Sequence, residues 1–204
     1  MIAEIVNPDY RFSSIVKITP EWLRVHKFCA ILMDIDNTLV ARNSWVVPEL
    51  HLDWLQKMQE QGICIVLASN NGGKRLDTIE KQLTDHNLCI PVFRWAGKPL
   101  PQAYSGAIRM LEDVAEKEGR SKLDPANCPN CILAAGDQLF TDVLGAHWYH
   151  LPAAWIRPLS QNDFIGTKLL RLLEKCVSWY LDKKRILPEE DCGNVNNKLK
   201  ESRF

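Results

Sequence analysis

The sequence predicts an α/β protein with a parallel sheet, and two observations indicate this. Short apolar runs alternate along the chain with longer segments in which apolar residues recur at helical spacing. Several short runs are apolar at nearly every position, which is typical of strands covered by helices on both faces. The chain has 204 residues, of which 46% are hydrophobic and 25% charged, so one folded domain with a sizeable core is expected.

The candidate elements follow in chain order. Five apolar runs predict strands, over residues 29–34, 63–69, 88–93, 131–136 and 153–157. Five periodic segments predict helices, over residues 19–25, 49–61, 73–86, 101–118 and 164–185. Thr19 and Pro20 supply an N-cap and a first-turn proline, and Gly62 ends the second helix. We therefore expect one domain over residues 1–185, with an N-terminal extension over 1–28.

Two segments lack periodicity. Residues 119–130 are rich in turn-forming residues and predict a loop, and residues 186–204 predict a poorly ordered tail. The loop contains Cys128, which with Cys131 has the spacing of half a zinc site or a redox pair. Because the sequence has no second cysteine pair of that kind, a turn followed by a strand-entry cysteine is the favoured interpretation.

Composition excludes several classes of protein. Twenty-five basic and twenty-five acidic residues give no net charge, which argues against nucleic-acid binding by bulk electrostatics. No apolar stretch reaches the roughly 20 residues of a membrane-spanning helix. The N-terminal residues lack the pattern of a secretory signal, and the seven cysteines are an odd number. We expect reduced thiols and a cytoplasmic location.

Polar side chains follow three of the apolar runs at the point where each run ends. Asp34, Ser69 and Asp137 occupy these positions, and the carboxyl ends of parallel strands meet at one edge of a sheet. Asp36 lies two positions after Asp34, so the two carboxylates can project the same way and act as nucleophile and general acid/base. Each signal alone also fits an ordinary turn or strand-to-helix loop.

Together the four signals resemble the haloacid dehalogenase (HAD) superfamily of phosphotransferases. The motifs are Asp34-x-Asp36-x-Thr38, Ser69 after an apolar strand, Lys98 before a helix, and Gly-Asp137-x-x-x-x-Asp142. The resemblance covers about residues 29–157. The resemblance implies a Rossmann-like three-layer sandwich whose five-stranded parallel sheet has the order 5-4-1-2-3.

The resemblance also implies the roles of the site residues. Asp34 would attack phosphorus and form an aspartyl-phosphate, while Asp36 would protonate the leaving oxygen and then activate water. Mg²⁺ would be bound by Asp34, the Asp36 backbone carbonyl and Asp137, with Asp142 either a further ligand or close behind the ligands. Phosphate would be bound by Ser69, Asn70 and Lys98, and Thr38 would fix the nucleophile loop by hydrogen bonding.

The spacing of the motifs leaves no room for a cap domain. Only 35 positions separate Asp34 from Ser69, and 29 separate Ser69 from Lys98. We expect an open site beneath a short flap over residues 40–48, in which Trp45 is a candidate substrate contact. An open site suits a phosphate presented by something large, such as a lipid, a protein or a polymer.

Further residues are similar to the capless, YqeG-like phosphatidylglycerophosphate phosphatases, most distinctively the run over residues 136–145. This resemblance implies dephosphorylation of phosphatidylglycerophosphate to phosphatidylglycerol. The chain departs from the subgroup at Ala146-His147-Trp148, where Gly-Asn-Arg is common. The alternatives are a phosphatase of phosphoproteins or of soluble sugar or nucleotide phosphates, and a non-catalytic binding module.

A lipid substrate requires contact with a membrane surface. The last predicted helix is amphipathic, basic and aromatic, so it could lie peripherally in a bilayer interface. Helices of this composition more often pack their apolar face on the sheet and leave the basic face in water.

Overall fold

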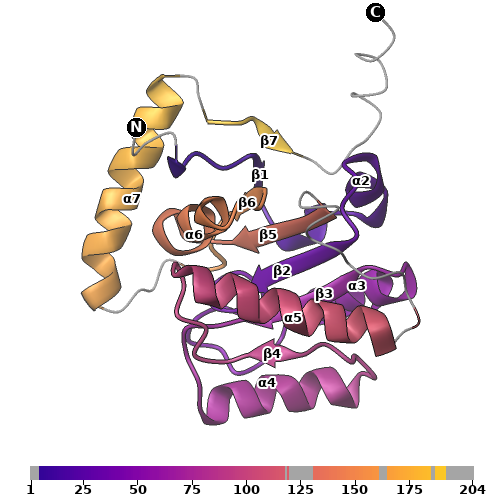
Figure 1. The fold of residues 1–204 in the computed structure, drawn as a ribbon. Helices are drawn as coiled ribbons and strands as arrows, with labels where there is room; N and C mark the ends of the chain where they lie inside the picture. The colour runs from indigo at the N-terminus through magenta and orange to yellow at the C-terminus, as the bar shows by residue number, and fades with distance from the viewer. Residues whose placement is uncertain (1–4, 118, 120–130, 161–164, 185–186, 192–204) are drawn as a thin grey trace, which may run out of the picture.

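The computed structural model describes residues 5–117, 119, 131–160, 165–184 and 187–191, with side chains omitted for 165–172. Seven parallel strands form one sheet in the order β4-β3-β2-β5-β6-β1-β7 (Figure 1). The strands are β1 (Tyr10–Phe12), β2 (Ala30–Asp34), β3 (Cys64–Ala68), β4 (Val92–Phe93), β5 (Ile132–Gly136), β6 (Ala153–Ile156) and β7 (Glu190–Asp191). The five predicted strands are β2 to β6, and their relative order is confirmed.

The predicted count of five strands is wrong, because β1 and β7 extend the sheet beyond β6. Both are short and carry charged residues, so neither produces the apolar run that predicts a strand. Contacts with distant residues hold β7: the Trp22 indole donates to Asp191 at 2.7 Å, and Arg157 pairs with Glu190 at 2.9 Å. The prediction of a disordered tail is thus wrong for Glu190 and Asp191, while residues 192–204 lie outside the described part.

The helices agree with the sequence patterns where these were long. They are α2 (Pro20–Val25), α3 (Glu49–Glu60), α4 (Lys74–Asp85), α5 (Pro101–Lys117), α6 (Leu144–Trp148) and α7 (Ile165–Lys183). Thr19 caps α2 by accepting from the Trp22 N–H, and Gly62 ends α3 with a φ of 79°. Two short elements and α6 were not predicted: η1 (Ile15–Lys17, a 3-10 helix) and η3 (Leu139–Val143, a π-helix). The predicted loop, except Gly119, lies outside the described residues, as does Cys128.

Alternation along the strands divides the core into two layers. Ile31 and Met33 of β2 pack into a cluster with α2, α3 and α4, whereas Ala30 and Leu32 pack into a second cluster with α5 and α6. Figure 1 shows α5 crossing one face of the sheet. The three-layer α/β sandwich is therefore confirmed. Asp34 lies two positions after Leu32 and four after Ala30, so its side chain projects from the same face of the sheet, toward α5.

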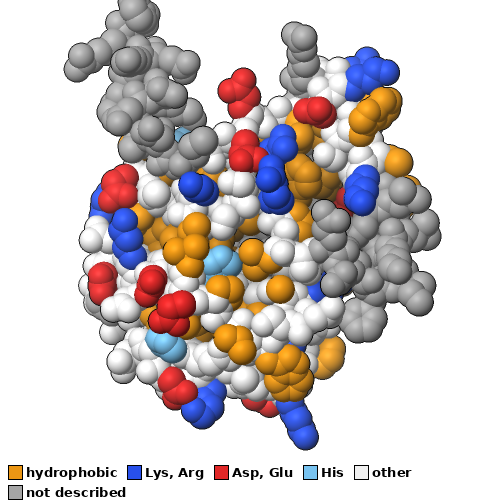
Figure 2. All heavy atoms as spheres, turned by 180° about the vertical axis from the view of Figure 1, so that it is seen from behind, with side chains coloured by type: hydrophobic (Ala, Val, Ile, Leu, Met, Phe, Trp, Pro, Cys, Tyr) orange, Lys and Arg blue, Asp and Glu red, His pale blue; other side chains and the backbone are white. Residues whose placement is uncertain are grey.

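The described residues include no membrane-spanning helix. None of the helices in the described ranges is both long and apolar enough to cross a membrane. On the face in Figure 2, hydrophobic side chains form scattered patches among polar and charged ones.

Candidate active site

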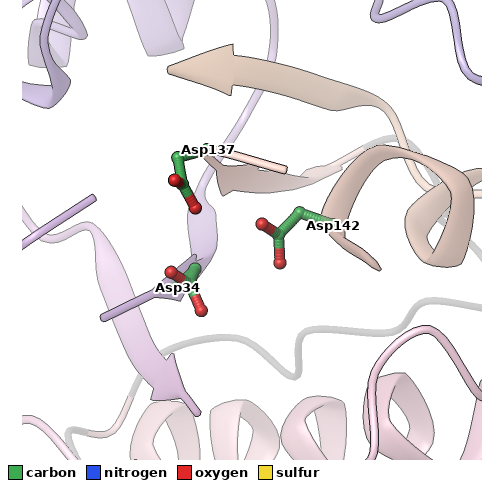
Figure 3. Close-up of side chains that lie close together, drawn as sticks. All are labelled: Asp34, Asp137 and Asp142. Atoms are coloured by element: carbon green, nitrogen blue, oxygen red, sulfur yellow. The ribbon is translucent and has the colours of Figure 1, made fainter. Parts of the chain in front are cut away.

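Three buried carboxylates meet at the carboxyl edge of the sheet. Asp34 ends β2, Asp137 follows β5, and Asp142 lies in η3. One carboxylate oxygen from each lies within 4.8 Å of the others, and Figure 3 shows the three groups converging on one space. Residues 103 positions apart thus meet because β2 and β5 are neighbours in the sheet.

The π-helix η3 places Asp142 against the end of β5. The Gln138 N–H donates to Asp142 Oδ2 at 3.0 Å, and the Tyr104 hydroxyl lies 3.0 Å from the carbonyl oxygens of Thr141 and Asp142. A Cβ on Gly136 would lie only 2.3 Å from Asp142 Cγ. This position therefore requires glycine for close approach, and the local π geometry is typical of functional sites.

Lys98 is the cation among these carboxylates. Its ammonium group contacts Asp34 Oδ1 and Asp142 Oδ1, the latter at 2.7 Å, and the side chain is buried. Asn70 holds the lysine backbone at both ends: the Lys98 N–H donates to Asn70 Oδ1 at 2.7 Å, and Asn70 Nδ2 donates to the Lys98 carbonyl at 2.8 Å. Asn70 therefore positions Lys98 in the structure, and its direct contact with phosphate remains a prediction.

The electrostatics of this group favour a bound divalent cation. Burial raises the pKa of Asp34 well above its ordinary value, and the Asp142 and Asp137 carboxylates add to that rise although Lys98 opposes it. Burial alone would lower the pKa of Lys98, but Asp142 and Asp34 raise it. With all three carboxylates ionised, as they would be around a metal ion, the three carboxylates and one ammonium carry an excess of two negative charges. The oxygen donors are those that Mg²⁺ prefers.

Asp36 lies beside the cluster in a separate network. Its Oδ2 accepts from the Ser69 hydroxyl at 3.3 Å and from Asn71 Nδ2 at 2.8 Å, while Arg75 Nη1 pairs with Oδ1 at 2.7 Å. The contacts of Asn71 and Arg75 with Asp36 were not predicted from the sequence. For Arg75 a signal was available, because it is a basic residue in the first turn of α4. A positive side chain there is unfavourable next to the helix dipole unless a nearby carboxylate compensates.

Several of these groups line an open cavity of about 710 Å³, among them Asp34, Asp36 and Lys98. Trp45 of the predicted flap lines it as well, whereas Ser69, Asp137 and Asp142 are buried and do not line it. The described residues between β2 and α3 form no helix or strand that could build a cap, as expected from the motif spacing. A phosphate can thus enter directly from the carboxyl edge of the sheet.

Comparison with known proteins identifies the family. The sequence family described as mitochondrial PGP phosphatase matches residues 3–158. The chain belongs to this PGP phosphatase family. It is also 30% identical over 184 residues to a probable phosphatase, YqeG, of Bacillus subtilis (strain 168), covering 90% of this chain and 96% of the relative. The chain is a phosphatase of this family, as the YqeG-like residues predicted.

Two solved structures resemble it at 14% identity. A haloacid dehalogenase-like hydrolase from Brucella suis 1330 has a TM-score of 0.45, with 72% of this chain and 93% of the other covered. A hydrolase from Streptococcus pneumoniae TIGR4 has a TM-score of 0.39, with 72% and 99% covered.

In the structure, Asn37 rather than Thr38 anchors the loop after Asp34. Thr38 is buried, but its hydroxyl finds no hydrogen-bond partner among the described residues, so the predicted hydrogen bond is wrong. Asn37 has a φ of 64°, and its Oδ1 accepts from the Arg42 N–H at 3.1 Å and the Ser160 hydroxyl at 2.8 Å. The Leu159 N–H donates to the Asn37 carbonyl, which ties this loop to the end of β6.

The departure from the YqeG-like pattern at His147 serves the fold. His147 contacts Asp9 Oδ2 at 3.0 Å and the Ile5 carbonyl at 2.5 Å. Both partners belong to the N-terminal extension, so His147 connects α6 to that extension and makes no contact with the acidic cluster.

Proposed function

We propose that the chain is a Mg²⁺-dependent phosphomonoesterase that acts through an aspartyl-phosphate on Asp34 and converts phosphatidylglycerophosphate to phosphatidylglycerol. The observation that supports this best is the convergence of Asp34, Asp137 and Asp142 around one space, with Lys98 beside them. The family match supports the lipid substrate, and the open cavity suits a phosphate that remains attached to a large body.

The proposed reaction has two displacements at phosphorus. In the first, an Asp34 oxygen forms a bond to phosphorus while the ester oxygen leaves and takes a proton from Asp36. In the second, Asp36 accepts a proton from water, the water oxygen bonds to phosphorus, and the Asp34 carboxylate is released with inorganic phosphate. Water therefore supplies one oxygen of the released phosphate. Asp34 is again a free carboxylate, and Asp36 is again protonated.

The remaining residues stabilise charge and orient groups. Lys98 and Ser69 would bind oxygens of the transferring phosphoryl group, which their positions beside Asp34 and Asp36 support. Lys98 would also offset negative charge that would repel the substrate. Asp34, the Asp36 carbonyl, Asp137 and Asp142 would hold Mg²⁺, which when bound supplies Lewis-acid stabilisation of phosphoryl oxygens.

The first test measures phosphate release from p-nitrophenyl phosphate, and from phosphatidylglycerophosphate in mixed micelles, with and without Mg²⁺. We expect metal-dependent turnover of both, a preference for the lipid, and loss of both activities in Asp34→Asn. Equal activity in Asp34→Asn would contradict the assignment of Asp34 as the nucleophile. Much faster turnover of soluble sugar or nucleotide phosphates, or of a phosphoprotein, would contradict the lipid substrate.

A further inference from the structure

Exposed apolar side chains border the mouth of the active-site cavity. Trp45, Val46, Trp95 and Leu100 have exposed fractions of 50%, 64%, 72% and 56%. We call these four residues the rim. Single exposed apolar residues need no explanation, but several gathered around one opening indicate an interaction surface.

Contacts with cavity residues place the rim at this opening. Trp45 itself lines the cavity. The backbone N–H of Trp95 donates to the Asn71 carbonyl at 3.2 Å. The Trp95 indole covers Gly72, where an added Cβ would lie 2.3 Å from the indole Nε1. Asn71 and Gly72 both line the cavity, and Leu100 follows Lys98 by two positions. The rim therefore comes from two loops at one entrance, the loop between β2 and α3 and the loop between β4 and α5.

The loop that carries Trp45 and Val46 is anchored through its backbone. Gln82 Nε2 donates to the Trp45 carbonyl at 2.6 Å, and the Val47 N–H donates to Gln82 Oε1 at 3.0 Å. Arg75 Nε donates to the Ser44 carbonyl at 2.8 Å. With the backbone held by α4, the two exposed side chains are presented to the outside instead of collapsing into the core.

Cationic groups accompany the rim. Arg42 lines the cavity, and Lys74 is exposed at the start of α4. The charges of Arg75 and Lys98, which also line the cavity, are used within the site, where Arg75 pairs with Asp36 and Lys98 with two carboxylates. Asp77 and Glu80 of α4 are paired with Arg94, the residue before Trp95. Tryptophan and aliphatic side chains flanked by cations fit the interface of an anionic bilayer.

We propose that the rim docks the phosphatase on an anionic phospholipid bilayer, with the cavity mouth against the headgroups. This proposal rests on the proposed lipid substrate, whose phosphate lies at headgroup depth. Helix α7 also exposes Trp179, at 63%, but the described residues of α7 do not line the active-site cavity. Docking through the rim brings the opening to the substrate, whereas α7 does not border that opening.

Vesicle flotation tests the proposal with binding, not activity, as the readout. The full chain is mixed with phosphatidylcholine vesicles with and without phosphatidylglycerol. We expect binding to the anionic vesicles, a loss of about tenfold or more in Trp45→Ser/Trp95→Ser, and no loss in Trp179→Ser. Val46→Trp should bind several-fold more tightly, which guards against a folding defect in the double variant.

The outcomes separate this proposal from the proposed function. Absence of binding by the unmodified chain, unchanged binding of the double variant, or a loss in Trp179→Ser instead would each overturn docking through the rim. Asp34→Asn should still bind vesicles, because it alters no rim residue. Failure of the unmodified chain to hydrolyse p-nitrophenyl phosphate would overturn the phosphatase mechanism and leave the binding result intact.

Discussion

Arg75 joins the proposed general acid/base to the flap. Its guanidinium pairs with Asp36 Oδ1 at 2.7 Å and donates through Nε to the Ser44 carbonyl at 2.8 Å. A planar, multidentate donor is suited to hold a carboxylate and a backbone carbonyl in one geometry. Arg75 is therefore a positioning residue that acts through Asp36.

Replacing Arg75 should impair reactions in which the leaving oxygen needs a proton. We expect Arg75→Gln to lower kcat for an alkyl phosphate by about 10- to 100-fold, less than the 10²–10⁴ of general acid–base catalysis itself. The effect on p-nitrophenyl phosphate should be smaller, because p-nitrophenolate is a weak base. Steady-state kinetics on both esters measure this difference. Arg94→Gln, which removes another arginine that pairs with carboxylates, is the control, and equal losses on both esters would contradict the positioning role.

The charge excess of the acidic cluster leads to a prediction about metal and stability. A cation that binds only the folded state adds about 2.7 kcal/mol at a hundredfold excess over Kd, which is roughly 5–10 °C in Tm for this chain length. Mg²⁺ should therefore raise the Tm of the unmodified chain, and a chelator should reverse the rise. Asp137→Asn should show a much smaller rise in differential scanning fluorimetry. An equal rise in that variant would place the ion elsewhere.

At the scale of elements, the junction of β5 with η3 decides where Asp142 lies. Short helical elements after β5 do not follow a 3.6-residue period, so no sequence pattern predicts the π-helix. Its position depends on Gly136, on the Gln138 N–H and on the Tyr104 hydroxyl, which comes from α5. Packing between β5, η3 and α5 thus decides where Asp142 joins the acidic cluster.

Adding a methyl group at this junction should displace Asp142. Gly136→Ala introduces a Cβ 2.3 Å from Asp142 Cγ, so we expect a stability loss of about 1–3 kcal/mol and a large loss of Mg²⁺-dependent activity. Urea denaturation and phosphate release measure the two effects. Gly106→Ala meets only the edge of the Phe93 ring, a side chain that can turn, and should retain activity. Full activity in Gly136→Ala would show that Asp142 is dispensable.

At the scale of the whole molecule, a pair between Asp9 and His147 attaches the N-terminal extension. Asp9 Oδ2 also accepts from the Ala153 N–H at 2.8 Å, at the start of β6. Because Asp9 and the Ile5 carbonyl both accept hydrogen bonds, the doubly protonated imidazole satisfies both, and the hydrogen bond to Asp9 raises the pKa of His147. Burial would raise the pKa of Asp9, but the His147 and Ala153 hydrogen bonds lower it.

The signs of these two shifts set a pH window for stability. The raised pKa of His147 stabilises the fold fully below the ordinary histidine value of about 6.5, and this is lost as pH rises through the raised pKa. The lowered pKa of Asp9 stabilises above its ordinary value, and this is lost at lower pH. We expect His147→Gln to remove up to about 1 kcal/mol near pH 6 and less near pH 8, since the pair is partly exposed. Urea denaturation at both pH values tests this, with His86→Gln as control; an equal loss at both would contradict the charged pair.

The sequence by itself determined the central sheet and the meeting of Asp34 with Asp137. Both depend on local information, because apolar runs specify buried strands and parallel strands end at one edge. The motif spacing likewise determined the absence of a cap, since a chain of that length cannot fold into one beside a helix and a strand.

Only the tertiary structure decided which residues contact the site residues and which strands extend the central sheet. Arg75 on Asp36, Asn70 on the Lys98 backbone, Asn37 at the end of β6 and the addition of β7 all join residues distant in the chain. Such contacts are selected by packing and by the need to pair buried polar groups, and they leave no periodic pattern. The same holds for the rim, where two loops meet at one opening because the sheet places β2 and β4 on either side of β3.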